Sequence, residues 1–71
     1  MEIYPYDIKV YKVSNASDGR WLLSNNRAKI IQQDSKSVTI EVTTGKSSSF
    51  DLIYRCESMN DIISNIKILS L

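Results

Sequence analysis

Few residues of this chain have the chemistry that catalysis needs. The sequence contains no histidine, so it has neither a Ser-His-Asp nor a Cys-His arrangement and no histidine general base. Its single cysteine, Cys56, stands on the apolar side of an alternating segment, where a small buried hydrophobic side chain is a commoner role than an activated nucleophile. The sequence therefore predicts a protein that is not an enzyme.

The acidic residues and one glycine-lysine fragment do not form a binding motif either. The aspartates are spread singly along the chain, at Asp7, Asp18, Asp34, Asp51 and Asp61. This spacing matches no metal-ligand pattern. Thr44-Gly45-Lys46-Ser47 has the end of a phosphate-binding loop, but Ile40 stands where its first glycine should be, so the fragment is interpreted as a turn. We expect no metal, no cofactor and no small-molecule substrate.

Length and charge limit the architecture and the partners. The 71 residues suffice for a single domain, residues 1–71, that hides roughly 60% of its unfolded surface. A formal net charge of +1 disfavours nucleic acid as a partner. The longest apolar runs, such as Trp21-Leu22-Leu23, are far too short for a membrane span, and the first residues lack the pattern of a secretory signal peptide. The compartment is left open.

Alternation of apolar and polar residues predicts strands in the second half of the chain. Ser37 to Thr44 alternates throughout, and Phe50 to Cys56 alternates with Ile53 out of phase. The two segments flank a polar stretch at Gly45 to Ser48, so we expect them to form a hairpin.

Shorter segments predict further strands upstream. They are Ile8–Val13, in which Ile8 and Val10 share a face, then Trp21–Leu23 and Ala28–Ile31. Strands thus recur about every 8 to 12 residues, the interval of antiparallel sandwiches and barrels. The predicted fold is all-β, a small antiparallel β-sandwich of about 6–7 strands.

The last segment, residues 58–70, has two interpretations. Ser58 to Asp61 is similar to a helix capping box, and Ile62, Ile66 and Leu69 recur at helical spacing. Asn65 to Leu69 also alternates, and a sandwich needs a final strand beside the one around Leu52. We favour the strand, with a short helical turn near 58–63.

The alternating apolar positions identify the predicted core. Its members are Trp21, Leu23, Val38, Ile40, Val42, Phe50, Leu52, Tyr54 and Cys56. For Trp21, a buried position across both sheets is favoured over an exposed position that stacks on a ligand.

Three other tyrosines define a possible interaction surface: Tyr4, Tyr6 and Tyr11. In the alternative interpretation, Pro5 protects an edge strand from pairing and the rings cover a small core.

Several segments follow one another in a set order: Trp21, then Ser37 to Val42, then Gly45 and Phe50 to Tyr54, with Cys56 two residues after Tyr54. This order resembles that of disulfide-free immunoglobulin-like repeat domains of bacteria and phages. The resemblance covers most of the chain and implies an immunoglobulin-like sandwich with Tyr54 at a strand corner, its hydroxyl bonded to backbone. No cysteine stands at Ile8 or Val10 to pair with Cys56. The first strand is then Ile3-Tyr4 alone, missing, or supplied by a neighbouring chain.

The resulting hypothesis is a non-enzymatic structural or interaction module. It would be an accessory or decoration domain of a phage particle, or a spacer and binding unit of a bacterial surface protein, that binds a protein partner or itself through an open sheet edge. The alternative is a small β-barrel that binds single-stranded nucleic acid or peptide. Its stacking platforms would be Tyr4, Tyr6, Tyr11 and Trp21, beside Lys9, Lys12 and Arg20.

Overall fold

The structure, a computed structural model, describes residues 1–14, 18–57 and 59–70. These residues form strands β1 (Glu2–Ile3), β2 (Ile8–Lys12), β3 (Arg20–Leu23), β4 (Ala28–Gln33), β5 (Ser37–Val42), β6 (Ser48–Cys56) and β7 (Met59–Ile68). Within those ranges there is no helix, so the fold is all-β. It follows that the described chain has no helix of the length and apolar character needed to cross a bilayer.

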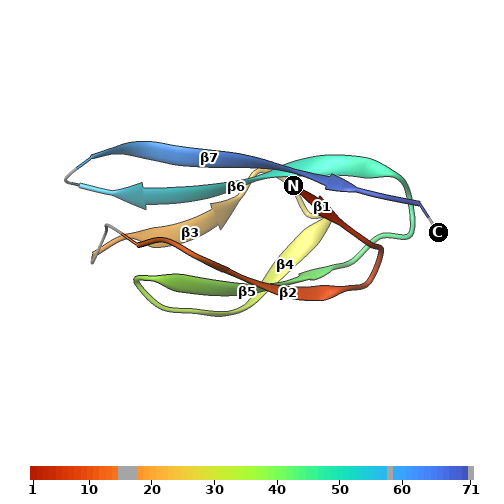
Figure 1. The fold of residues 1–71 in the computed structure, drawn as a ribbon, viewed down its shortest axis with the longest axis horizontal. Coiled ribbons are helices and arrows are strands. Elements are labelled where there is room, and N and C mark those ends of the chain that lie inside the picture. The colour runs from red at the N-terminus through yellow and green to blue at the C-terminus, as the bar shows by residue number, and fades with distance from the viewer. Residues whose placement is uncertain (15–17, 58, 71) are drawn as a thin grey trace.

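The strands form two sheets that pack as a sandwich (Figure 1). One sheet has the order β1-β7-β6-β3 and the other the order β2-β5-β4. All pairs are antiparallel except β1 with β7, which run parallel.

Strict alternation places one face of each central strand in the core. On β5, Val38, Ile40 and Val42 are buried, and on β6 the same is true of Phe50, Leu52 and Tyr54. The other members of the buried core cluster are Ile3, Trp21, Ala28, Ile66 and Ile68. Because successive residues of a strand point to opposite faces, these side chains meet between the two sheets and hold them together.

Two of the nine residues predicted for the core lie at its margin. Leu23 and Cys56 are half-buried and pack against the buried cluster, whereas the other seven are buried. Both residues stand near the end of their strands, where the opposite sheet no longer covers the side chain completely.

The strand predicted for the C-terminal segment is confirmed, and the helical turn near 58–63 is wrong. β7 begins at Met59 and pairs with β6 from Met59 to Ile68, with a register shift between Met59 and Ile62, while Ser58 lies outside the described residues. The β-branched isoleucines of this segment pack on the pleated surface of β6, and this tertiary contact outweighs the local capping signal.

The hairpin predicted for the two most regular segments is also wrong. β5 pairs with β2 and β4, whereas β6 pairs with β3 and β7, so the chain crosses from one sheet to the other between Val42 and Ser48. The actual hairpins are β4–β5 and β6–β7. Both β5 and β6 have a buried apolar face, and in a sandwich those two faces can meet only across the core.

The face that Ile8 and Val10 share is the outer one. These side chains are 60% and 53% exposed, while Tyr11 on the opposite face is half-buried. β2 is an edge strand, and its inward-facing positions hold Lys9 and Tyr11, which pair with Ile40 and Val38 of β5.

Trp21 lies inside the sandwich at 6% exposure. Its ring meets that of Tyr54 edge to face at a centroid distance of 4.8 Å, and its Nε1–H donates to the carbonyl of Asp34 at 3.1 Å. The indole therefore joins the two sheets and is not available to stack on a ligand.

Tyr54 also joins the sheets, and the expected bond of its hydroxyl to backbone is confirmed, although Tyr54 lies within β6 and not at a strand corner. Its hydroxyl donates to the carbonyl of Ser35 at 2.6 Å, and it accepts from the backbone N–H of Gly19 at 2.9 Å. Ser35 lies in the turn between β4 and β5, so the hydroxyl bonds to the turn that connects two strands of the opposite sheet.

Candidate interaction surface

The outer face of the β7-β6-β3 sheet carries three rows of side chains that run across the strands. Residues directly opposite one another on neighbouring strands share a face and contact each other. The pairing of β3 with β6 and of β6 with β7 therefore determines which residues meet in each row.

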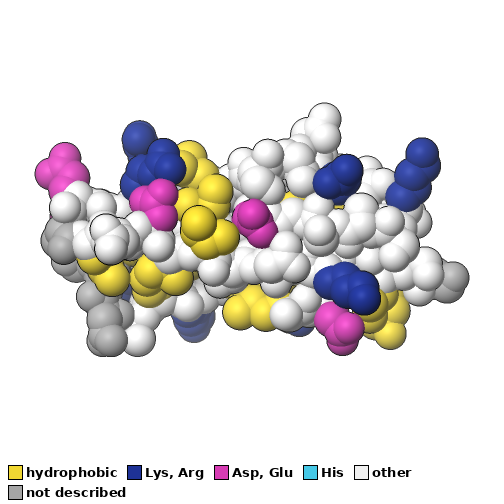
Figure 2. All heavy atoms as spheres, turned by 90° about the horizontal axis from the view of Figure 1, so that it is seen from above, with side chains coloured by type: hydrophobic (Ala, Val, Ile, Leu, Met, Phe, Trp, Pro, Cys, Tyr) yellow, Lys and Arg dark blue, Asp and Glu magenta, His cyan; other side chains and the backbone are white. Residues whose placement is uncertain are grey.

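The middle row is apolar. Leu22 pairs with Ile53, and Ile53 pairs with Ile63. Leu22 and Ile53 are half-buried, and Ile63 at the open end of the row is 61% exposed. Figure 2, which looks onto the side of the molecule where β7 lies, shows a cluster of hydrophobic side chains bordered by charged ones.

A charged row lies on one side of the apolar row. Arg55 of β6 binds both carboxylate oxygens of Asp61 on β7, with its Nη2 at 2.8 Å from Oδ2 and its Nε at 3.2 Å from each oxygen. These hydrogen bonds hold the pKa of Asp61 below its ordinary value and raise the pKa of Arg55. Arg20 of β3 stands opposite Arg55.

A polar row lies on the other side. The backbone N–H of Asp51 donates to Oγ of Ser24 at 2.8 Å, and Nδ2 of Asn65 donates to Oδ1 of Asp51 at 3.0 Å. The apolar row thus lies between two hydrogen-bonded polar rows, an arrangement in which an apolar centre has a polar rim.

The edge of this sheet at β7 is open along most of the strand. β1 pairs only with Lys67 and Ile68, and the backbone N–H of Lys67 donates to the carbonyl of Met1 at 2.9 Å. From residue 59 to residue 66, no described strand pairs with the outer edge of β7. The N-terminal strand therefore covers only the last part of the edge.

The other sheet edges carry features that oppose pairing. β2 contains Lys9 and Lys12, and Lys9 is on the inward face. β4 contains Lys29 and an irregularity in register between Ile30 and Gln32. Lysines, inward-facing charges and bulges are the usual means by which edge strands avoid pairing with other chains.

The β3 edge is short and is closed by the opposite sheet. β3 has only four residues, and the backbone N–H of Trp21 donates to Oε1 of Gln33 on β4 at 3.0 Å. By contrast, β7 has neither lysine nor proline before Lys67. Its pairing with β6 shifts in register only near its start, between the pairs Cys56–Met59 and Tyr54–Ile62, and is regular from Ile62 to Ile68. This regular stretch offers the fewest obstacles to an added strand.

A small cavity of about 80 Å³ opens between the β7 edge and β2. It is lined by Met1, Tyr11, Lys12, Val13, Trp21, Leu52, Tyr54, Ile62 and Ser64. The hydroxyl of Tyr11 is buried here and has no hydrogen-bond partner among the described residues, and burial raises the pKa of Tyr11. Buried polar groups normally have a partner, so the Tyr11 hydroxyl is an exception within this cavity.

The three tyrosines predicted as one interaction surface do not lie together. Tyr4 and Tyr6 are exposed in the turn between β1 and β2, in which the N–H of Asp7 donates to the carbonyl of Tyr4 at 3.2 Å. Tyr11, in contrast, points between the sheets. Pro5 at the second position of this turn is buried, and Tyr6 has a φ of 63°. The turn holds Tyr6 in a left-handed conformation that glycine or asparagine usually takes.

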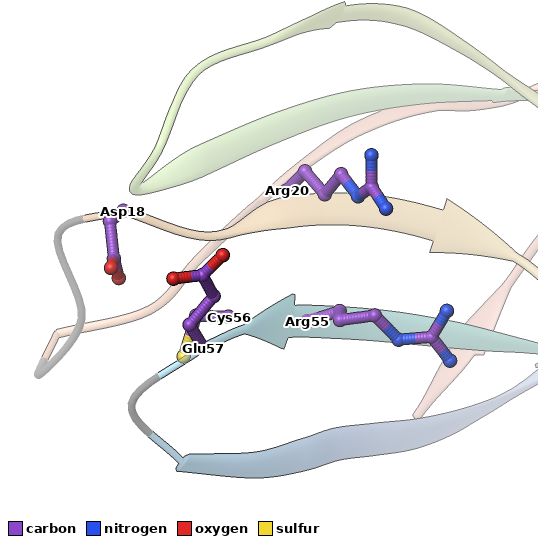
Figure 3. Close-up of a pocket in the computed structure, with 5 residues that line it drawn as sticks. All are labelled: Asp18, Arg20, Arg55, Cys56 and Glu57. Carbon is purple, nitrogen blue, oxygen red and sulfur yellow. The ribbon is translucent and has the colours of Figure 1, made fainter.

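A shallow depression at the end of β3 and β6 is lined by Asp18, Arg20, Arg55, Cys56 and Glu57 (Figure 3). In Figure 3 the guanidinium groups of Arg20 and Arg55 point along the strands, away from the carboxylates of Asp18 and Glu57. No cluster of ligating side chains that could hold a metal ion occurs in the described part of the chain. The depression brings together no set of groups that would act on one substrate.

The predictions from the sequence did not include the apolar row, nor Ile53 and Ile63, the two residues that extend it to the β7 edge. Ile53 stood out as the one apolar residue out of phase in its segment, and Ile63 belonged to the segment that was ambiguous between helix and strand. An out-of-phase isoleucine is the signal that could have indicated an apolar outer face.

Comparisons of the chain with protein-family models, with curated proteins and with solved structures find no match. The functional conclusion therefore depends on the rows, the edge and the cavity described above.

Proposed function

We propose that this protein is a non-enzymatic immunoglobulin-like interaction module that binds another polypeptide by accepting a strand at the β7 edge. In such recognition, main-chain hydrogen bonds to the edge supply affinity, and side chains that alternate along the added strand supply specificity.

The strand order supports the immunoglobulin-like part of the proposal. In the constant-type fold, strands A, B, E and D form one sheet and strands C, F and G form the other. Here β2, β5 and β4 have the order of B, E and D, while β7, β6 and β3 have the order of G, F and C. Trp21 stands on the strand in the position of C, where that fold has its buried tryptophan. β1 differs, because it pairs with β7 instead of β2.

The open stretch of β7 is the observation that carries the proposal. Residues 59–66 present an unpaired edge with no lysine and no proline and with a register shift only between Met59 and Ile62, whereas β2, β3 and β4 are each obstructed. An unprotected edge next to an apolar row is the combination that strand addition uses.

The setting of the module belongs to the same proposal and rests on the resemblance alone. The protein would be an accessory or decoration domain of a phage particle, or a spacer and binding unit of a bacterial surface protein. Binding of single-stranded nucleic acid is not proposed, because Trp21 is buried and Tyr11 faces the space between the sheets.

The test uses proline to remove single outward-pointing N–H groups. The N–H of Lys67 points away from β6, and positions two and four residues earlier on the strand have the same orientation, so the N–H of Ile63 also points outward. Peptides of about 10 residues that are selected from a random library for binding the wild-type protein should bind the Ile63→Pro variant at least about tenfold more weakly.

Val10→Pro is the matched control. The N–H of Val13 donates to the carbonyl of Lys36, next to the start of β5, and the carbonyl of Asp7 accepts from the N–H of Val42 on β5. The N–H of Val10 between them therefore points away from β5, at the other edge. Peptide binding should survive Val10→Pro, and both variants should keep the wild-type β-sheet circular dichroism. Selected peptides that bind both proline variants as well as wild type would show that the β7 edge is not the binding site.

A further inference from the structure

We infer that the chain that occupies the β7 edge is a second copy of this protein, paired antiparallel about a twofold axis that passes through Ile63. The inference rests on the proposed function, because it names the partner of the same edge. The inference is supported because the β7 edges of two copies match each other in their apolar contacts and in their charges.

The backbone orientation permits this pairing. Ile63 lies opposite Ile53 in a pair whose backbone groups point away from each other, so its N–H and C=O are directed to the open edge. In the proposed register, the two Ile63 residues exchange both of their backbone hydrogen bonds. Asn65 of each copy then lies opposite Asp61 of the other.

The apolar row becomes continuous across the two copies. Within one chain it runs from Leu22 through Ile53 to Ile63, and it ends at the open edge with its most exposed member. A second copy places its own Ile63 directly beside the first. The row would then run without interruption across six strands, β3, β6 and β7 of each copy, and the exposed end of each row would be covered by the other.

In this register, the charged residues on the β7 edges of the two copies are compatible with each other. Asp61 faces the uncharged Asn65 of the other copy and lies diagonal to that copy's Lys67, at a separation of about 7–8 Å. Within its own chain Asp61 is already held by Arg55. No two like charges stand directly opposite each other along residues 61 to 65, so a second copy meets no repulsion there.

The same register closes the cavity beside Tyr11. Ile62 and Ser64 line that cavity, and they face the inside of the sandwich. An antiparallel second copy brings its Ser64 opposite Ile62 at the mouth of the cavity. The second copy would thus cover the mouth of the cavity that Tyr11 lines.

The extent of the contact indicates a weak dimer. Met1 and β1 already occupy the edge at Lys67, so pairing is limited to residues 61 to 65 of each copy. An interface of this length falls below the ~1,200 Å² of a standard stable complex, so we expect association at concentrations of roughly 10 µM to 1 mM.

Analytical ultracentrifugation over that concentration range tests the inference. The wild-type protein should shift from monomer to dimer and form no larger species, because a twofold interface is closed. Ile63→Lys, which places two lysines against each other at the axis, should abolish the shift. Leu22→Lys changes the same apolar row far from the edge and should leave the dimer intact. Loss of the dimer in both variants would overturn edge pairing in favour of contact between sheet faces.

Cysteine cross-linking tests the register. In a Cys56→Ser background, Ile63→Cys should form a disulfide-linked dimer under mild oxidation, because Cα atoms of a hydrogen-bonded antiparallel pair lie about 5.5 Å apart. Asn65→Cys should cross-link far more slowly, since the two copies of residue 65 would be roughly 13 Å apart along the strand. Equal rates for the two variants would overturn the register.

The two proposals fail in different ways. A strictly monomeric wild-type protein at 1 mM, together with selected peptides whose binding is lost in Ile63→Pro, would overturn the second copy as partner and retain strand addition at the edge. Peptide binding and dimer formation that are both insensitive to Ile63→Pro would overturn the edge as the binding site.

Discussion

The removal of one oxygen atom by Tyr54→Phe tests how the two sheets are held together. The Tyr54 side chain is buried, and its hydroxyl donates to the carbonyl of Ser35 at 2.6 Å while it accepts from the N–H of Gly19 at 2.9 Å. Phenylalanine keeps the ring and its edge-to-face contact with Trp21, so the change isolates the hydroxyl from the packing.

The magnitude follows from the two hydrogen bonds. Each contributes about 0.5–1.5 kcal/mol net, and a buried group left without its partner costs more than the bond itself. Ser35 and Gly19 are only half-buried, so water restores part of the loss. We expect the free energy of unfolding to fall by about 2–3 kcal/mol, which for a domain of this size lowers the Tm by roughly 8 to 24 °C.

Urea denaturation followed by tryptophan fluorescence measures this change. The buried indole of Trp21 becomes solvated on unfolding, so its emission reports the transition directly. The midpoint should fall while the slope with urea concentration stays the same, because the surface exposed on unfolding is unchanged.

Tyr4→Phe is the matched control, since Tyr4 is exposed in the β1–β2 turn. Its free energy of unfolding should stay within about 0.5 kcal/mol of wild type. An equally small change for Tyr54→Phe would refute the reasoning, because the hydroxyl would then contribute nothing to the joining of the sheets.

Three further predictions concern a close contact, the core and the acid range. Gly19→Ala should lower the free energy of unfolding by about 1–3 kcal/mol, since a Cβ at residue 19 would overlap the ring of Tyr54; wild-type stability in the same urea assay would contradict this. Ile40→Ala removes a fully buried side chain and should cost about 2–5 kcal/mol by the same measurement, whereas Ile31→Ala at an exposed position should cost less than about 0.5 kcal/mol. The backbone N–H groups of Lys36 and Ser37 donate to the Asp34 carboxylate and hold its pKa below its ordinary value. The ionised carboxylate therefore stabilises the fold fully above the unfolded pKa of about 4, and this contribution is lost as the pH falls through the lower folded pKa. Between pH 6 and pH 2 the Asp34→Asn variant should therefore lose less stability than the wild-type protein. Urea midpoints at several pH values measure this difference, and equal losses for the two proteins would contradict the prediction.

Local patterns in the sequence predict the strands well where one face of a strand is buried. Val38, Ile40 and Val42 alternate with polar residues and lie in the core, because the pleat of a strand sends successive side chains to opposite sides. The pattern is less informative at the edges. On β2 the predicted face of Ile8 and Val10 is the solvent-exposed one, since an edge strand that is covered on one side only can place lysine and tyrosine inward.

Pairing between strands could not be predicted from neighbouring segments. β5 and β6 follow each other closely and both alternate, yet they belong to different sheets because their apolar faces meet across the core. The C-terminal segment had a capping signal of its own, and its contacts with β6 decided that it is a strand. The candidate site depends on these same pairings, because Leu22, Ile53 and Ile63 are far apart in the sequence.

The sequence by itself determined that the chain is an all-β sandwich, which side chains fill most of its core, and that a histidine-based active site is absent. These properties follow from residue types and from a period of two, which acts over a few neighbouring residues. Only the tertiary structure decided that β1 covers just the end of β7, that the rest of this edge is open, and that an apolar row leads to it. Those features depend on the register of strands that meet from distant parts of the chain, and no local pattern encodes that register.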